Sequence, residues 1–340
     1  MDGRRIMPSS RAVTRMVTVL AIVLAPQHAA AQSPDGRTGT LIVLNKSEAT
    51  ATFIDVASGT TVATLPTGRG PHELAITADG RWAVSTDYSG GNSLTVLDVA
   101  NVRVVRTIDL SRYSRPHGAF FLPGDSILVV TSEGTGNVVL VHPLRGDIVG
   151  VIGTGDARSH MVAVTGDGRT LYTGNIQAGT VSRIDVASRR VTATFDVPAQ
   201  PEAITVSRDG AEVWVGSNAT GVVSIVDTET GAVDSPLSGF EWPYRILSVE
   251  EHGLVVIPDL GRHVVRFVDY ESRTDISRLE LPGEGPQGVA LTADRGTLFL
   301  SLSNAGQVAV IDLSSRRIVR RIEAGPTPDG IGWSPLVVRR

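Results

Sequence analysis

Apolar and polar positions alternate along this chain in a unit that returns seven times. Each unit begins with a small or proline residue and a polar residue, continues as an apolar strand, and ends in an Asp-Gly-type turn. The units begin at Pro71-His72, Pro116-His117, Ser159-His160, Pro201-Glu202, Pro243-Tyr244, Pro286-Gln287 and Pro328-Asp329, in steps of 42 to 45 residues. Repeats of this size built from short strands are typical of propeller blades. The pattern therefore predicts an all-β, seven-bladed β-propeller with four strands in each blade.

The two ends of the chain explain how such a ring would close. After Pro328-Asp329 the sequence holds only one more strand, whereas three strand-like segments at 40–44, 51–54 and 61–65 precede the first unit. We expect the last blade to combine one C-terminal strand with these three N-terminal strands, because that pairing leaves no open sheet edge at the seam. The propeller then spans residues 38–334, and residues 335–340 form a loose C-terminal tail.

Residues 1–31 differ from the repeats. A leader with four arginines precedes an apolar run over 16–25, and Ala29-Ala30-Ala31 stands before Gln32. This order is typical of a secretory signal peptide, so we predict cleavage after Ala31 and a periplasmic or secreted protein. The alternative is an uncleaved N-terminal anchor, although the apolar run is short for a membrane span.

Composition narrows the classes of function. The chain has no cysteine, which excludes disulfides, zinc–thiolate sites and thiol catalysis. Removing the four Arg and one Asp of residues 1–31 makes the formal net charge of -4 more negative by three. With no cluster of Lys or Arg, we expect no nucleic-acid partner. The expected partners are a small-molecule ligand or an envelope protein, and we expect a monomer with no membrane span after cleavage.

The repeat also sorts polar residues into columns. Hairpin connectivity places the start of each inner strand and the end of each second strand on one face of the ring, here called face one, and the Asp-Gly turns on face two. The inner column is His72, His117, His160, Glu202, Tyr244, Gln287 and Asp329. The outer column is Asn45, Asp87, Glu133, Asn175, Asn218, Asp259 and Asn304. No comparable concentration of polar residues is expected on face two.

Three of the seven histidines of the chain fall in one column on consecutive units. Neighbouring blades aimed at one axis would bring His72, His117 and His160 together, and imidazole is a common ligand of transition metals. We therefore predict a divalent transition metal on these histidines, with Glu202 as a fourth ligand or a base. Asp87 and Glu133 would orient the imidazoles. The alternative is that each imidazole bonds only to a carbonyl or to channel water.

Further candidates flank this column. Arg115 and Arg245 could bind a carboxylate or phosphate, or else form ion pairs between blades. The candidates for catalysis are Glu202, Glu133 and Arg115, and those for ligand binding are Asp87, Tyr244, Arg245, Gln287 and Asp329. A nucleophile elbow, a P-loop and a dinucleotide fingerprint are missing from the sequence. Covalent serine or cysteine catalysis is therefore not expected.

Two segments carry a family resemblance, VVSIVDTETG at 222–231 and PQGVALTAD at 286–294. Over about residues 38–334 the chain resembles the YVTN-type seven-bladed propellers, including the exported proteins related to YncE. The resemblance implies the fold more than the activity, because this family includes ligand binders and cofactor-linked propellers. A more distant similarity of layout is to propellers whose histidines hold iron, copper or haem d1 over the channel.

A narrower resemblance is to the seven-bladed lactonase and muconate-cyclising group. The order of His72 with Asp87, then Arg115-Pro116-His117 with Glu133, is similar, but the proline after Arg115 and the third histidine, His160, depart from it. The resemblance implies that a His and Glu pair moves the proton of lactone opening or closure while Arg115 binds a carboxylate. The reaction classes are thus lyase, hydrolase or metal-dependent oxidoreductase, and the alternative is a non-catalytic interaction scaffold in the cell envelope.

Overall fold

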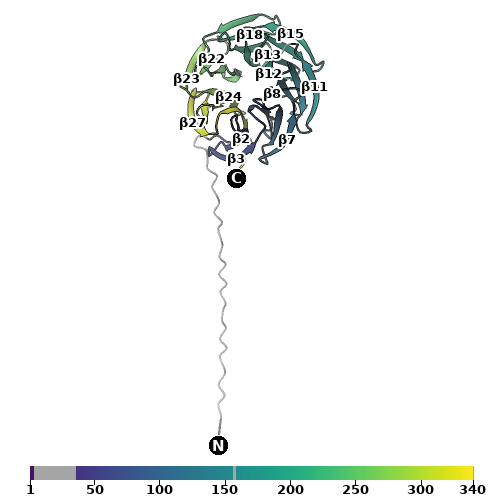
Figure 1. Cartoon of the computed structure of the whole chain (residues 1–340). Helices are drawn as coiled ribbons and strands as arrows, with labels where there is room; N and C mark the ends of the chain where they lie inside the picture. Colours follow the sequence, from purple (N-terminus) through teal and green to yellow (C-terminus); the bar gives the residue numbers. More distant parts are fainter. Residues whose placement is uncertain (4–35, 156–157, 340) are drawn as a thin grey trace. The chain divides into compact units, whose positions relative to one another are not determined.

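Short apolar strands joined by tight turns form seven four-stranded antiparallel sheets arranged in a ring (Figure 1). The computed structural model describes residues 1–3, 36–155 and 158–339. The prediction of an all-β, seven-bladed propeller is confirmed. Nearly all of the signal peptide predicted at 1–31 lies outside the described residues. Within the described ranges, no helix is long and apolar enough to cross a membrane.

We number the blades from the sheet that begins at Pro71. Blade 1 is β4 (Pro71–Ile76), β5 (Trp82–Asp87), β6 (Ser93–Asp98) and β7 (Arg103–Asp109). Blade 2 is β8 (Pro116–Phe121), β9 (Leu128–Ser132), β10 (Asn137–His142) and β11 (Asp147–Gly153). Blade 3 is β12 (Ser159–Val164), β13 (Thr170–Asn175), β14 (Thr180–Asp185) and β15 (Arg190–Asp196). Blade 4 is β16 (Pro201–Val206), β17 (Glu212–Ser217), β18 (Val222–Asp227) and β19 (Val233–Leu237).

The remaining blades follow the same order. Blade 5 is β20 (Leu247–Val249), the 3-10 helix η1 (Glu250–His252), β21 (Leu254–Asp259), β22 (Val264–Asp269) and β23 (Asp275–Glu280). Blade 6 is β24 (Pro286–Leu291), β25 (Thr297–Leu302), β26 (Gln307–Asp312) and β27 (Arg317–Glu323). Blade 7 is β28 (Pro328–Ser334), β1 (Thr40–Asn45), β2 (Thr50–Asp55) and β3 (Thr60–Pro66).

Blade 7 is the predicted seam, and β28 pairs antiparallel with β1 there. The segment after β28 is anchored rather than loose over its described residues. Thr40 Oγ1 donates to the carbonyl of Leu336 at 2.7 Å and accepts from the N–H of Val338 at 3.2 Å. Val338 is buried beside Ile42. The C-terminal residues therefore cover the seam that closes the ring.

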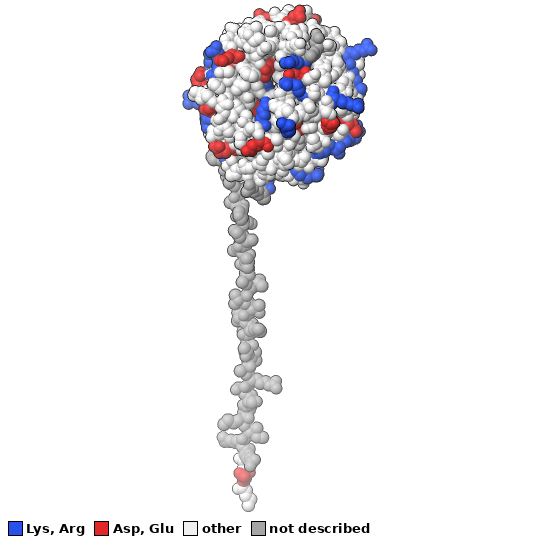
Figure 2. All heavy atoms as spheres, in the orientation of Figure 1, with Lys and Arg blue, Asp and Glu red and all other residues white. Residues whose placement is uncertain are grey.

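The hydrophobic core lies between neighbouring blades. Leu41 and Ile54 of blade 7 pack with Phe299 and Val310 of blade 6, and Trp214 of blade 4 packs with Val255 of blade 5. Each fully buried side chain of this kind stabilises the fold by about 1.5–3 kcal/mol. Acidic and basic side chains are intermixed over the face seen in Figure 2. The charged side chains visible on this face form no large patch of one sign.

A bulge near the start of the inner strand decides where the polar column points. In blade 1, Pro71 pairs with Asp87 and Leu74 with Ser85, so His72 and Glu73 together oppose Thr86. The hydroxyl of Thr86 accepts the N–H of Glu73 at 3.0 Å. In blade 2 the hydroxyl of Thr131 accepts the N–H of Gly118 at 2.8 Å. In blade 6 the hydroxyl of Ser301 accepts the N–H of Gly288 at 2.7 Å. Because two residues oppose one, the bulge re-aims side chains that would otherwise alternate between the faces of the sheet.

Blade 5 departs from the repeat. The pattern predicts that its inner strand begins at Pro243-Tyr244, whereas β20 begins only at Leu247 and Pro243 forms an isolated bridge to Asp259. Arg245 folds back on this segment, because its Nη1 donates to the carbonyl of Tyr244 at 2.6 Å and its guanidinium lies 4.1 Å from the centre of the Tyr244 ring. A side chain thus takes the place of a ladder hydrogen bond at this carbonyl.

Gly330 offers a test of how tightly the inner strands approach each other. A Cβ at this position would overlap the backbone oxygen of His72 in the next blade. Gly330→Ala is therefore expected to lower the free energy of unfolding by about 1–3 kcal/mol, measured by urea denaturation. Gly153→Ala is the matched control, since its Cβ would meet only Asn137 Oδ1 at 3.8 Å. Equal losses in the two variants would contradict the close approach.

Candidate ligand site at the mouth of the central channel

The starts of the inner strands surround a cavity of about 300 Å³ on face one. The predicted residues in its wall are His72, His117, His160, Glu133, Glu202, Tyr244 and Gln287. Sequence reasoning did not select Lys46, Tyr88, Arg158, Ile176, Trp242 and Leu260, which also line it. The ring therefore brings most of the inner column to one place.

The three imidazoles form a contiguous series. The ring centres of His72 and His117 are 4.3 Å apart with planes at 80°, and those of His117 and His160 are 3.5 Å apart with planes at 31°. All three side chains are buried. Tyr88 joins the series, because its ring stacks on His72 at 5.1 Å and meets His117 edge-on at 4.7 Å.

His72 is held by a buried carboxylate. Its Nδ1 lies 2.5 Å from Asp329 Oδ2, which also accepts from Lys46 Nζ at 2.8 Å, and Tyr244 donates its hydroxyl to Asp329 Oδ1 at 3.2 Å. Burial acts to raise the pKa of Asp329, but His72 and Lys46 outweigh it and hold that pKa well below its usual range. Burial lowers the pKa of His72 despite the attraction of Asp329. A neutral His72 that donates from Nδ1 keeps its lone pair on Nε2.

His160 has a different environment, between two glutamates. Its Nδ1 lies 3.1 Å from Glu133 Oε2 and its Nε2 lies 3.7 Å from Glu202 Oε1. Burial acts to lower the pKa of His160, but the two carboxylates raise it above its ordinary value. Burial likewise opposes the shift at Glu133, where the hydrogen bonds from His160 and Tyr88 lower the pKa to about 2. His160 is therefore an ion-pair partner of Glu133, while its buried Nε2 makes no hydrogen bond within the described part of the chain.

His117 lies between these two environments and has no carboxylate partner. Its Nδ1 is buried and, in the described part of the chain, has no hydrogen-bond partner. Burial, and then the neighbouring His160 and His72, lower its pKa well below the ordinary value. A buried polar atom without a partner costs about 1–3 kcal/mol, so this nitrogen is suited to receive a ligand.

One group in this region could hold a metal ion. His72, Glu73 and His117 each offer a ligand atom, and these atoms all lie within 4.8 Å of one another. The prediction named His160 and Glu202 in place of Glu73. Sequence reasoning missed Glu73 because consecutive residues of a regular strand point to opposite sides. The bulge removes that alternation, and the hydroxyl of Thr86 opposite is the signal that could have found it.

The outer column mixes residues of different register. Asp87 pairs with Pro71, but the equivalent partner of Pro116 is Ser132, so Glu133 lies one residue further along. A shift of one residue sends the side chain to the other side. Asp87 accepts from Ser93 Oγ at 2.6 Å and Thr95 Oγ1 at 2.9 Å in its own blade.

Burial raises the pKa of Asp87 to about 6. Its hydrogen bonds with described residues stay within blade 1 and the preceding loop, at Gly68. The structure therefore does not bring Asp87 to the histidines, whereas it does bring Glu133.

Arg115 reaches the site through other side chains. It pairs with Glu133 at 3.0 Å, donates to the hydroxyl of Tyr88, and lies 4.6 Å from the centre of the Tyr88 ring. Tyr88 in turn donates to Glu133 at 2.5 Å. The Arg115 side chain is half exposed, so it can contact a ligand that enters from solvent.

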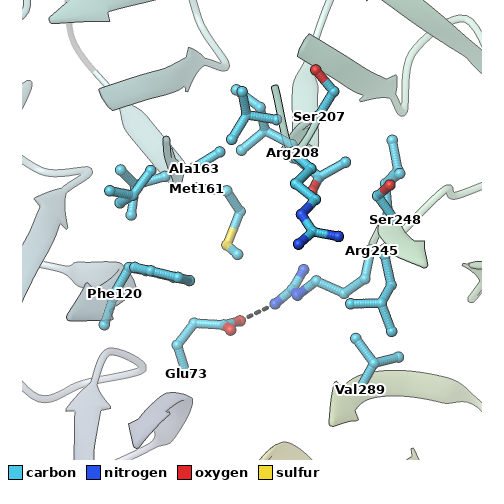
Figure 3. A pocket seen from close by; sticks show the side chains of 18 of the residues that line it. Glu73, Phe120, Met161, Ala163, Ser207, Arg208, Arg245, Ser248 and Val289 are labelled. Carbon is cyan, nitrogen blue, oxygen red and sulfur yellow. Dashed lines mark hydrogen bonds and ion pairs between the residues drawn. The ribbon is translucent and has the colours of Figure 1, made fainter. Parts of the chain in front are cut away.

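Arg245 lines a different cavity from the three histidines. It forms an ion pair with Glu73, which joins blades 1 and 5 across the ring, and both line a second cavity of about 540 Å³ (Figure 3). Burial lowers the pKa of Arg245 to about 10, so the guanidinium remains charged at neutral pH. Arg245 is therefore separated from the histidine cavity that it was expected to serve.

Comparison with known proteins shows similarity to one family over part of the chain. A sequence model described as YNCE-like beta-propeller matches residues 124–235, which lie in blades 2 to 4. No curated protein matches the sequence. The hydrazine synthase of Kuenenia stuttgartiensis is similar in structure, with a TM-score of 0.71, 21% identity, and coverage of 83% of this chain and 94% of that one.

Two further solved structures are similar. A functionally unknown protein from Desulfotomaculum acetoxidans has a TM-score of 0.73 and 17% identity, with 87% of this chain and 99% of that one covered. Dihydro-heme d1 dehydrogenase NirN, in complex with DHE, has a TM-score of 0.62 and 20% identity, with 88% and 66% covered. At these identities the likeness shows the fold alone. The sequence match over residues 124–235 and the ring of seven blades together show that this chain is similar to the YNCE-like β-propellers.

Proposed function

We propose that this propeller binds a divalent transition metal in its channel through His72, Glu73 and His117, and a small-molecule ligand in the cavity above it on face one. The observation that carries the proposal is the mutual distance of at most 4.8 Å among one ligand atom from each residue. Two imidazoles and one carboxylate form a donor set that suits zinc, copper, iron or nickel.

The neighbours of these residues support the assignment. Asp329 orients His72 as carboxylates orient metal-binding histidines in general. His117 is neutral and carries a buried nitrogen without a partner in the described structure. A metal would satisfy that nitrogen, to which no carbonyl or side chain of the described residues is hydrogen-bonded.

The reactions that such a site could support depend on its unfilled coordination positions. Three protein ligands leave coordination positions for a small molecule, and His160 with Glu133 and Glu202 can hold or move a proton beside it. Arg115 would bind a carboxylate of the ligand at the entrance. Lyase, lactone hydrolysis and metal-dependent oxidation are the reaction classes that this arrangement supports. From the leader sequence we expect the protein in the periplasm or the exterior.

Metal content tests the proposal. Untagged protein is loaded with Co²⁺, desalted, and examined by elemental analysis and by visible absorption of the bound ion. We expect about one ion per chain, and a loss of at least tenfold in affinity for His117→Ala and Glu73→Gln, in line with the removal of a ligand or its support. His252→Ala, an exposed histidine of η1, is the control that retains the metal.

His160→Gln separates the two possible ligand sets. If Glu73 is the third ligand, this variant keeps its metal and its cobalt spectrum, whereas a site of three histidines would lose both. Absence of stoichiometric metal in the wild type, or its retention in His117→Ala, would contradict the proposal and favour a non-catalytic envelope scaffold.

A further inference from the structure

The second cavity opens where the inner strands end, on face two, and the repeat pattern predicts no site there. Apolar side chains form much of its wall, among them Leu74, Phe120, Met161, Ile204 and Val289. Figure 3 shows Phe120, Met161 and Val289 around a space that charged side chains enter from two sides. Pockets of this size, about 540 Å³, commonly hold small organic ligands.

Two guanidinium groups extend into this space. Figure 3 shows Arg208 and Arg245 reaching toward each other from different elements. Arg245 is paired with Glu73. The side chain of Arg208 has no ion pair or hydrogen bond with the described residues, and its backbone N–H donates to Glu250 Oε1 at 2.7 Å. Arg245 is therefore paired with a carboxylate of the cavity, whereas the side chain of Arg208 is not.

The other charged side chains of the wall are already engaged. Glu250 also accepts from Ser248 Oγ at 3.1 Å, and Glu251 pairs with Arg295 at 3.0 Å. Arg208 is thus the cation that remains available to an anionic ligand.

Both Arg208 and Phe120 depart from the repeat at their positions. Counting from the turn that ends each inner strand, the equivalents of Phe120 are Ala75, Ala163 and Ala290 in blades 1, 3 and 6. The equivalents of Arg208 are Ala78, Gly166 and Ala293. Small residues therefore suffice for the fold at both positions, yet a large aromatic side chain that is 48% exposed and an unpaired arginine face the same cavity.

We infer that this cavity is a second binding site, which meets the metal site at Glu73, for an amphipathic organic monocarboxylate. Arg208, whose side chain has no partner among the described residues, holds the carboxylate, and Arg245 lies beside it. Phe120 and Met161 contact the apolar part of the ligand. A guanidinium fork matches a carboxylate in geometry, and an alkyl or aromatic chain matches the apolar wall.

Calorimetric titration with octanoate, in buffer with a metal chelator, tests the inference. We expect one octanoate per chain, and a loss of affinity of about tenfold or more in Arg208→Met, because a hydrogen bond to a charged group is removed. Arg169→Met is the control, since Arg169 is exposed on the neighbouring blade and does not line the cavity. Phe120→Ala should weaken both octanoate and 1-octanol.

A titration with the neutral alcohol 1-octanol tests whether the carboxylate is needed for binding. 1-Octanol has a similar chain without the charge, so it should bind more weakly than octanoate and equally well to wild type and Arg208→Met. Failure of octanoate to bind, an unchanged affinity in Arg208→Met with native thermal unfolding, or equal binding of alcohol and acid would each overturn the inference. Because the chelator removes metal, none of these outcomes depends on the metal site.

Discussion

Replacement of Asp329 by alanine is expected to lower the free energy of unfolding by about 3–5 kcal/mol, as when one partner of a buried ion pair is removed. Asp329 is fully buried and binds His72 of blade 1, Lys46 of blade 7 and Tyr244 of blade 5. Without it, three polar groups from three blades lose their common acceptor. The Lys46 side chain is 26% exposed, so solvent reduces its part of the cost.

Urea denaturation across pH measures this effect. The pKa of Asp329 is depressed in the folded state, whereas an unfolded aspartate has a pKa of about 3.9. The stabilisation is therefore present in full above about pH 5 and declines as pH falls below about 4. The difference between wild type and Asp329→Ala should shrink in that acidic range, and a difference independent of pH would contradict the role of the charge.

Asp185→Ala is the control for Asp329. Asp185 ends β14, and its carboxylate accepts from the N–H and hydroxyl of Ser188 in an exposed turn. Its loss should cost only about 1 kcal/mol. An equal cost at the two positions would mean that the network around Asp329 adds nothing beyond a local hydrogen bond.

Glu133→Gln is expected to have the second largest effect, about 2–4 kcal/mol, because His160 and Arg115 lose their charged partner and the acceptor of the Tyr88 hydroxyl changes. The raised pKa of His160 gives stability that is present below its unfolded value of about 6.5 and is lost as pH rises through the folded pKa. The depressed pKa of Glu133 gives stability that is present above about pH 4.3 and is lost as pH falls toward about 2.

The destabilisation by Glu133→Gln should therefore be largest between about pH 4.5 and 6.5. Urea denaturation of metal-free protein over this pH range measures the loss of stability. NMR follows the titration of His160 in wild type and variant. The pKa of His160 should fall in the variant. Glu280→Gln, at an exposed position of β23, should change the stability by no more than about 0.5 kcal/mol. A His160 titration that is the same in wild type and variant would refute the pairing.

Much of the architecture could be read from the chain. Starts at Pro71, Pro116 and the later units in steps of 42 to 45 residues indicated the number of blades, and the surplus of N-terminal strands indicated the seam at β28 and β1. These features depend on local strand and turn preferences and on the need to pair every sheet edge. Both are expressed in the order of residues along the chain.

The convergence of His72, His117 and His160 was also predictable, since radial repetition places equivalent residues near one axis. Their roles were not. His160 is paired with Glu133, and Glu73 takes its place beside the other two imidazoles.

The sequence by itself thus determined the number of blades, the closure of the ring and the column that faces the channel. Only the tertiary structure decided that Glu73 lies near His72, that Asp87 stays inside its blade, and that Arg245 lines the second cavity. The physical reason is that a bulge or a shift of one residue reverses a side chain, and both depend on which residue of the neighbouring strand lies opposite.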